Sequence, residues 1–221
     1  MIPWPNQPGL YGMRLPNSKQ HFTLLLPDTP GDQPSTLIMI LHWSGPATPY
    51  FGKSILIGLA APALQDLRAL IVAPDCMHTR WNNPESETDV LTLLSHLSEH
   101  YEIAVSKTLI MGYSMGAQGV WYLTARNPNR IAAGIVMAGP PPDKYQEPWQ
   151  TPMYVIHSYD DEHFPFEITA DVIQEMQIQS APIEFVPISG VTHFDAGGFV
   201  EPLRKATPWI QQIWLTKGEL P

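Results

Sequence analysis

Short runs of apolar residues alternate along the chain with longer stretches in which apolar positions recur every three or four residues. The short runs are typical of β-strands, and the longer stretches are typical of amphipathic helices. The predicted strands cover residues 21–27, 36–42, 69–74, 107–113, 131–139, 152–158 and 183–189. The predicted helices cover residues 52–67, 85–101, 115–127, 166–180 and 207–215.

Two prolines refine the helix predictions. Pro62 falls inside the stretch 52–67, so we expect that helix to kink or divide there. Thr207 and Pro208 open the last helix, and we expect Thr207 to be its N-cap and Pro208 its first helical residue.

Strands that alternate with helices at this spacing indicate right-handed crossover units and a fold of the α/β class. We therefore expect a mostly parallel sheet with helices on both faces. The 221 residues can bury one sizeable core, so we expect a single domain over residues 1–221. In such sheets, ligands bind beyond the carboxyl ends of the strands, and chemical groups are expected in the loops that follow strands.

Composition excludes several classes of partner. The net charge of −9 argues against nucleic acid, whose binding requires a clustered basic face. No apolar run approaches the roughly 18 residues of a membrane span, and the N-terminal residues do not read as a signal peptide. Cys76 is the only cysteine, so no internal disulfide can form, which fits a reducing compartment. We expect a cytoplasmic location, and nothing in the pattern indicates an oligomeric state.

The stretch "LIMGYSMGAQG", residues 109–119, carries the strongest chemical signal. Ser114 directly follows the predicted strand 107–113 and precedes a predicted helix, with Gly112 and Gly116 on either side. This G-x-S-x-G arrangement is typical of a sharp turn that presents a serine nucleophile, because side chains at the glycine positions would collide across the turn. We predict Ser114 to be the nucleophile.

A serine hydroxyl needs a base, usually histidine, and the base needs a carboxylate that orients it. On this topology the acid and then the base follow the nucleophile along the chain. Only His193, of eight histidines, lies in a loop after the final predicted strand. Asp160 and Asp161 both follow the strand 152–158 and both qualify as the acid.

The stretch "HSYDDEH", residues 157–163, also offers ligand types that suit a metal. No partner constellation stands elsewhere in the chain, so we expect neither a metal site nor a cofactor.

Acyl transfer also requires two backbone amides that stabilise the developing oxyanion. Met115, the residue after the nucleophile, is expected to supply one. The loop "LHWSGP", residues 41–46, is expected to supply the other, from Ser44 or, as the alternative, from Trp43. The rings of Trp43 and Trp81 lie in loops after strands, so we expect both to line the substrate pocket.

Together, "LHWSG", "GYSMGA", "HSYDDEHFP" and "GVTHF" resemble the oxyanion, nucleophile, acid and histidine loops of α/β-hydrolases. The resemblance is to the phospholipase/carboxylesterase group and to feruloyl-esterase and polyhydroxybutyrate-depolymerase relatives, from about residue 20 to 215. The acid motif of these relatives, H-G-x-x-D-x-x-V-P, selects Asp161. Their H-G-x oxyanion motif places the amide at Ser44. Trp43, Ala117 and Ser158 each stand where these relatives usually have glycine.

The resemblance implies an α/β-hydrolase fold without a substantial cap domain, because only residues 140–151 separate the two strands between which larger relatives insert a cap. It implies a serine esterase that cleaves small-molecule carboxylic esters through an acyl-enzyme, without a cofactor. The alternatives are a thioesterase or acylaminopeptidase that uses the same triad, and a non-catalytic binding protein built on this fold. The pattern does not specify the acyl or alcohol group of the substrate.

Overall fold

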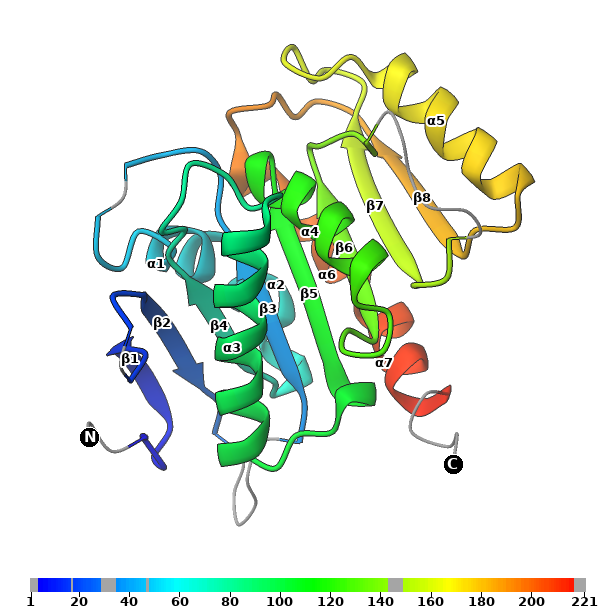
Figure 1. Cartoon of the computed structure of the whole chain (residues 1–221). Coiled ribbons are helices and arrows are strands. Elements are labelled where there is room, and N and C mark those ends of the chain that lie inside the picture. The colour runs from blue at the N-terminus through cyan, green and yellow to red at the C-terminus, as the bar shows by residue number, and fades with distance from the viewer. Residues whose placement is uncertain (1–3, 17, 29–34, 47, 143–148, 217–221) are drawn as a thin grey trace.

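The computed structural model describes residues 4–16, 18–28, 35–46, 48–142 and 149–216, and its eight strands form one sheet (Figure 1). The order across the sheet is β1-β2-β4-β3-β5-β6-β7-β8. The strands are β1 (Gly9–Arg14), β2 (His21–Leu26), β3 (Leu37–Leu41), β4 (Leu70–Pro74), β5 (Thr108–Tyr113), β6 (Ala133–Met137), β7 (Met153–Ser158) and β8 (Ile183–Ile188). β1 pairs antiparallel with β2 and β2 with β4, whereas all pairs from β4 to β8 are parallel. The prediction of a mostly parallel sheet is confirmed.

Strand β1 was not predicted from the sequence. It lies at the edge of the sheet, where Gly9 pairs with Leu26 and Arg14 pairs with His21. Three prolines at positions 3, 5 and 8 precede it, and its exposed residues alternate with residues that are partly buried or, at Met13, buried. An edge strand needs only one buried face, so its apolar signal is weak.

The helices lie on both faces of the sheet (Figure 1). They are α1 (Lys53–Ile55), the π-helical η1 (Leu56–Ala60), α2 (Ala61–Leu64), the 3₁₀ turns η2 (Gln65–Leu67), η3 (Val105–Lys107) and η4 (Ala196–Phe199), and the α-helices α3 (Pro84–His100), α4 (Met115–Arg126), α5 (Phe166–Ile178), α6 (Val200–Arg204) and α7 (Thr207–Thr216). The predicted helix over 52–67 is one run of consecutive helical segments, in which the π-helical η1 ends two residues before Pro62. Pro62 is the second residue of α2, a position where its missing N–H costs little.

The end of the chain differs in two details from the sequence prediction. η4 and α6 occupy residues 196–204, which we had not assigned to a helix, because Gly197, Gly198 and Pro202 obscure the helical pattern. Thr207 is the first residue of α7 rather than its N-cap, since the Ile210 N–H already bonds to the Ala206 carbonyl.

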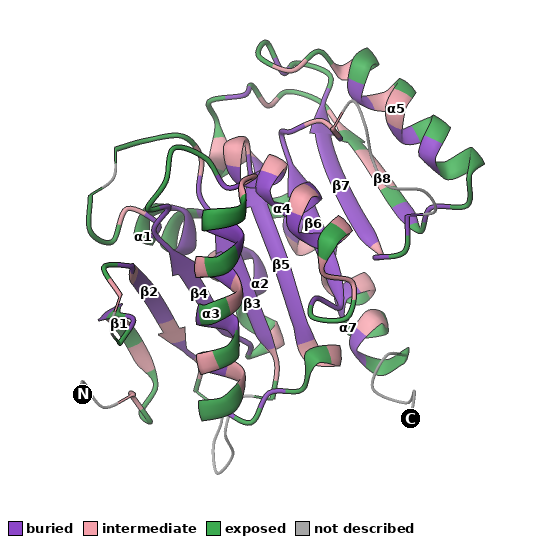
Figure 2. Ribbon diagram, viewed as in Figure 1, coloured by how far each residue is buried: buried purple, intermediate pink, exposed green. Residues whose placement is uncertain are grey.

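Alternate residues of the buried strands feed two separate apolar cores. In β3, Leu37, Met39 and Leu41 face the core that α3, α4 and α5 cover. Ile38 and Ile40 face the opposite core, which α1, η1, α2, α6 and α7 cover. Figure 2 shows the central strands buried along their whole length. A strand covered on both faces has no polar face, which explains its continuous apolar run.

The described residues between β6 and β7, 138–142 and 149–152, contain no helix, so this part of the structure forms no cap over the sheet. Within the described residues, no helix combines the length and the apolar character that a membrane crossing requires.

Candidate active site

Ser114 sits in a strained turn between β5 and α4. Its backbone has φ 54° and ψ −117°, a conformation that residues with a side chain rarely adopt. A Cβ added at Gly112 would lie 2.3 Å from the Gly116 carbonyl oxygen, and one added at Gly116 would lie 2.1 Å from that of Leu41. Only glycine fits at either position, so the two glycines allow the turn that lifts Ser114 out of the sheet.

Three side chains that are distant in the sequence meet above this turn. The Ser114 hydroxyl lies 2.9 Å from Nε2 of His193, and Nδ1 of His193 lies 3.0 Å from Oδ2 of Asp161. The Asp161 side chain is fully buried and His193 is 5% exposed. With Nδ1–H donating to the carboxylate, Nε2 is left as the acceptor that faces the serine hydroxyl. The structure thus brings together the three residues that the sequence predicted.

The two aspartates of the acid loop make different contacts. Oδ1 of Asp161 accepts the N–H groups of His163, at 2.9 Å, and of Phe164, at 2.8 Å. Burial alone would raise the pKa of Asp161, but the hydrogen bonds from Phe164, His193 and His163 together lower it. Asp160 is exposed, and its Oδ2 accepts the N–H of Gly190 at 2.6 Å. Asp161 is therefore the charged partner of His193, and Asp160 secures the loop that carries it.

Polar contacts hold the backbone of His193 on both sides. Its N–H donates to Oε2 of Glu162 at 2.8 Å, and its carbonyl accepts the hydroxyl of Tyr113 at 2.7 Å. Burial raises the pKa of Tyr113, so its hydroxyl stays protonated and able to donate. Neither residue was predicted from the sequence, since nothing in the spacing of Tyr113 and Glu162 connects them with a loop some 30 to 80 residues further on.

His157, near the end of β7, contacts the acid loop through its ring. Its Nε2–H donates to the Phe164 carbonyl at 2.9 Å, and the same nitrogen lies 4.0 Å from Oδ2 of Asp161. Nδ1 of this buried ring has no hydrogen-bond partner. Burial lowers the pKa of His157, which keeps the ring neutral beside the acid.

His42 fixes the loop that follows β3. Its Nδ1–H donates to the Trp43 carbonyl at 2.6 Å, and its Nε2 accepts the N–H of Cys76 at 3.1 Å. Phe51 and Trp81 pack edge-on against the ring, with ring centroids 4.8 Å and 5.1 Å away. Burial lowers the pKa of His42, so the neutral ring holds both contacts. The loop that carries Trp43 and Ser44 is consequently well supported.

The two amides expected to hold the oxyanion flank the nucleophile. Met115 is the first residue of α4, and the first N–H groups of a helix have no partner within it. Ser44 is exposed and lines the same cavity as Ser114. The choice of Ser44 over Trp43 as the second donor stays a prediction.

The two tryptophans expected in the substrate pocket differ. Trp43 lines the cavity together with Ser114 and His193. Trp81 is only 1% exposed and lies in the core, where its indole N–H donates to the His42 carbonyl at 2.9 Å. This burial does not agree with the expectation that Trp81 contacts substrate. The position of Trp81 after a strand gave no signal of the side chain's direction.

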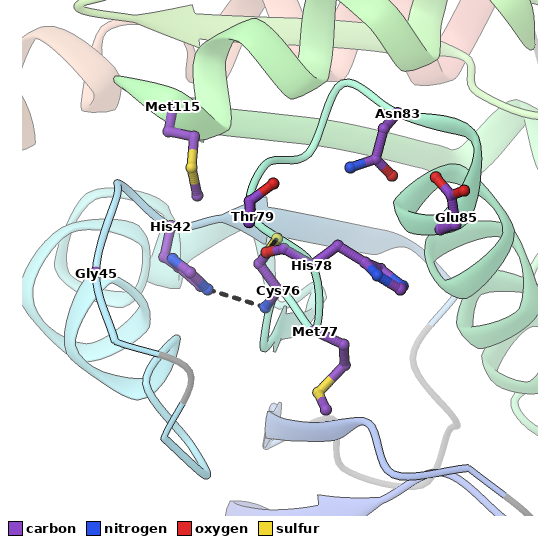
Figure 3. Close-up of a pocket in the computed structure, with 9 residues that line it drawn as sticks. All are labelled: His42, Gly45, Cys76, Met77, His78, Thr79, Asn83, Glu85 and Met115. Carbon is purple, nitrogen blue, oxygen red and sulfur yellow. Dashed lines mark hydrogen bonds between the residues drawn. The ribbon is translucent and has the colours of Figure 1, made fainter.

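Two cavities adjoin the nucleophile turn. The first, of about 550 Å³, is lined by Trp43, Ser44, Tyr113, Ser114, His163, His193, Phe194 and Ala196. The second, of about 570 Å³ (Figure 3), is lined by His42, Gly45, Cys76, Met77, His78, Thr79, Asn83, Glu85 and Met115. Among the described residues, no group of three or more histidine, cysteine or acidic side chains could hold a metal ion.

Several solved structures share this fold. A thermostable esterase aligns with a TM-score of 0.74 and 20% identity over 92% of this chain, which spans only 62% of that esterase. An S-formylglutathione hydrolase from Staphylococcus aureus aligns with a TM-score of 0.73 and 12% identity, over 95% of this chain and 99% of its own. A ferulic acid esterase aligns with a TM-score of 0.73 and 18% identity, over 93% and 98%. At such identities the similarity establishes the fold alone.

The sequence comparisons give a narrower result. None of the curated proteins matches this sequence. The model of the dienelactone hydrolase family matches residues 70–208, which is more than half of the chain and includes the elbow, acid and histidine loops. The chain therefore belongs to the dienelactone hydrolase family of α/β-hydrolases.

Proposed function

We propose that this protein is a serine hydrolase that cleaves carboxylic esters through an acyl-enzyme. The observation that carries the proposal is the continuous chain of contacts from the Ser114 hydroxyl through the His193 imidazole to the buried Asp161 carboxylate, at 2.9 Å and 3.0 Å. Each distance is within hydrogen-bonding range, and each group has the type that its role in nucleophilic catalysis demands.

In the acylation step, Nε2 of His193 takes the hydroxyl proton as Ser114 Oγ forms a bond to the ester carbonyl carbon. The resulting oxyanion accepts hydrogen bonds from the backbone N–H groups of Met115 and Ser44. The imidazolium, stabilised by Asp161, then gives its proton to the alcohol oxygen as the carbon–oxygen bond breaks. Water repeats the sequence on the acyl-enzyme, which releases the carboxylic acid and restores the Ser114 hydroxyl.

The lowered pKa of Asp161 supports its role in this scheme. A carboxylate that stays ionised below its usual titration range, near pH 3.9, can stabilise the imidazolium throughout the pH range in which His193 acts as a base. The strained backbone of Ser114 supports the scheme as well, because strain of this kind persists where function requires it.

The same three groups could act on thioesters or amides. Among the described residues, those that line the two cavities include no lysine or arginine that would bind the phosphates of a nucleotide-bearing thioester. This composition favours simple esters. A side-by-side assay of ester, thioester and amide substrates with one common acyl group ranks the three directly.

The variant Ser114→Ala tests the proposal. We expect it to lose about 10⁶-fold in kcat toward p-nitrophenyl acetate, as removal of a triad nucleophile does elsewhere. Circular dichroism and thermal unfolding of the variant serve as the control for folding. Retention of wild-type activity by folded Ser114→Ala would contradict the proposal, and a wild-type protein without hydrolytic activity would favour a binding protein on this fold.

A further inference from the structure

Two pairs of consecutive residues separate the two cavities. Ser44 and Ser114 line the first cavity, whereas their successors Gly45 and Met115 line the second. Figure 3 shows the Met115 side chain extending from the start of α4 toward the second cavity. The reacting carbonyl of a bound ester would therefore lie between two spaces of similar size.

The position of His193 distinguishes the two spaces. The leaving alcohol receives its proton from Nε2 of His193, so its oxygen must lie within hydrogen-bonding reach of that nitrogen. His193 lines the first cavity and is absent from the lining of the second. The alcohol thus belongs in the first cavity, and the acyl substituent, which points away from the base, is directed past Met115 toward the second.

Most polar groups of the second cavity are already satisfied within the protein. The Cys76 thiol donates to the His78 carbonyl at 2.9 Å. The Asn83 side chain accepts the Ser86 N–H at 2.7 Å and donates to the Arg80 carbonyl at 2.9 Å. These groups form the cavity wall. Because they are already hydrogen-bonded within the protein, they contribute little to the binding of a ligand.

Glu85 differs from these groups. It is exposed in the first turn of α3 and lines the cavity, and its carboxylate makes no hydrogen bond or ion pair within the described residues. His78 lies 3.3 Å from Asp89, so any positive charge on this histidine is already paired. The part of the lining that the structure describes contains no lysine or arginine. Among the described residues that line it, the second cavity therefore carries one carboxylate without an ionic partner, at the end away from Met115 (Figure 3).

We propose that the second cavity binds the acyl group of the ester, and that Glu85 selects acyl groups ending in an ammonium or hydroxyl group over those ending in a carboxylate. This inference rests on the proposed function. A carboxylate such as Glu85 accepts hydrogen bonds and attracts cations, whereas a second carboxylate in the same cavity would be repelled. Met115, Met77 and Cys76 give the lining of this cavity an apolar and sulfur-rich character, which suits a short methylene chain.

The test uses three p-nitrophenyl esters with six-carbon acyl groups: hexanoate, 6-aminohexanoate and the monoester of adipate. We expect kcat/KM to be about tenfold higher for the aminohexanoate than for the adipate monoester. In Glu85→Gln this ratio is expected to fall toward one. The matched control is Glu99→Gln, which removes the same charge from an exposed position about 21 Å further along α3 and should leave the ratio at its wild-type value.

A second pair of substrates tests the assignment to the acyl side. Acetylcholine and 3,3-dimethylbutyl acetate share an acetyl group and differ only in the charge of the alcohol. If Glu85→Gln changes the ratio between these two esters and leaves the acyl series unchanged, the cavity binds the alcohol and the proposal is overturned. If Glu85→Gln changes neither the ratio within the acyl series nor the ratio between the two acetate esters, the proposal is also overturned.

The two proposals fail in different ways. A wild-type protein that hydrolyses none of these esters contradicts the serine esterase itself. A wild-type protein that hydrolyses p-nitrophenyl hexanoate, yet shows no acyl charge preference that depends on Glu85, contradicts only the acyl subsite.

Discussion

The loops on the two sides of Ser114 are supported by different means. On the oxyanion side, aromatic packing supports the His42–Ser44 loop, with the partly buried Phe51 and the buried Trp81 against His42. On the histidine side, hydrogen bonds to the backbone hold the loop, and two of the acceptors are the exposed carboxylates of Asp160 and Glu162.

The difference matches what each loop must present. In the proposed mechanism the oxyanion loop offers a backbone amide that must stay in one position, and close packing provides such rigidity. The histidine loop carries an imidazole that exchanges protons with two partners, and directional hydrogen bonds set the orientation of its ring. Two buried histidines also differ in their hydrogen bonding. His42 has both ring nitrogens paired, whereas Nδ1 of His157 is unpaired.

The largest effect is expected from Trp81→Ala, which removes the packing beneath the oxyanion loop. Loss of this buried ring should lower the free energy of unfolding by about 3–5 kcal/mol. The lost support of His42 should also lower kcat by on the order of tenfold or more, since one oxyanion donor is worth 10² to 10³. Denaturant unfolding and kcat per folded enzyme measure the two effects.

Trp214→Ala is the matched control for this variant, because Trp214 is a buried tryptophan of α7 in the opposite core. It should lose comparable stability while the folded enzyme keeps its kcat. Equal losses of kcat in both variants would show that Trp81 does not act through the loop.

His157→Gln addresses the acid loop through pH. Burial lowers the pKa of His157 in the folded protein, so below about pH 6.5 the unfolded chain binds a proton that the folded protein does not. His157 therefore makes stability fall as pH decreases from about 6.5 toward the lowered pKa, by at most about 1.4 kcal/mol per pH unit. Glutamine can still donate to the Phe164 carbonyl but cannot titrate. The variant should show a shallower fall, and an unchanged slope in unfolding measurements from pH 7 to pH 5 would count against this account.

Tyr113→Phe should give the smallest effect. It tests one defined contact on the histidine side. It removes one hydroxyl, which donates to the His193 carbonyl at 2.7 Å, and leaves the ring in place. A hydrogen bond of this kind contributes about 1 kcal/mol, so kcat should fall about fivefold while KM changes little. If steady-state kinetics show an unchanged kcat, Tyr113 has no part in positioning His193.

The sequence was most informative where local geometry and chemistry coincide. The turn at Ser114 needs glycines because of backbone contacts that recur in every such turn, so the motif alone identified it. The order of the strands along the chain left His193 as the one suitable histidine. The choice of Asp161 over Asp160 required the resemblance to known hydrolases, because adjacent residues in a loop point in directions that no periodicity specifies.

Other features depended on side-chain directions in three dimensions. Trp81 follows a strand as Trp43 does, yet one ring is buried and the other lines the cavity. The contacts of Tyr113 and Glu162 with the backbone of His193 join segments that only the folded sheet brings together. The edge strand β1 is buried or partly buried only at alternate positions, whereas a central strand such as β5 is buried throughout. The prolines before β1 further obscured the strand pattern.

The most direct test of the central claim is covalent labelling with a fluorophosphonate probe, followed by peptide mapping by mass spectrometry. The account predicts a single adduct on Ser114, with its rate of formation strongly reduced in His193→Ala. Ester hydrolysis by a protein that carries no adduct on Ser114, or an adduct that forms equally fast without the imidazole of His193, would contradict it.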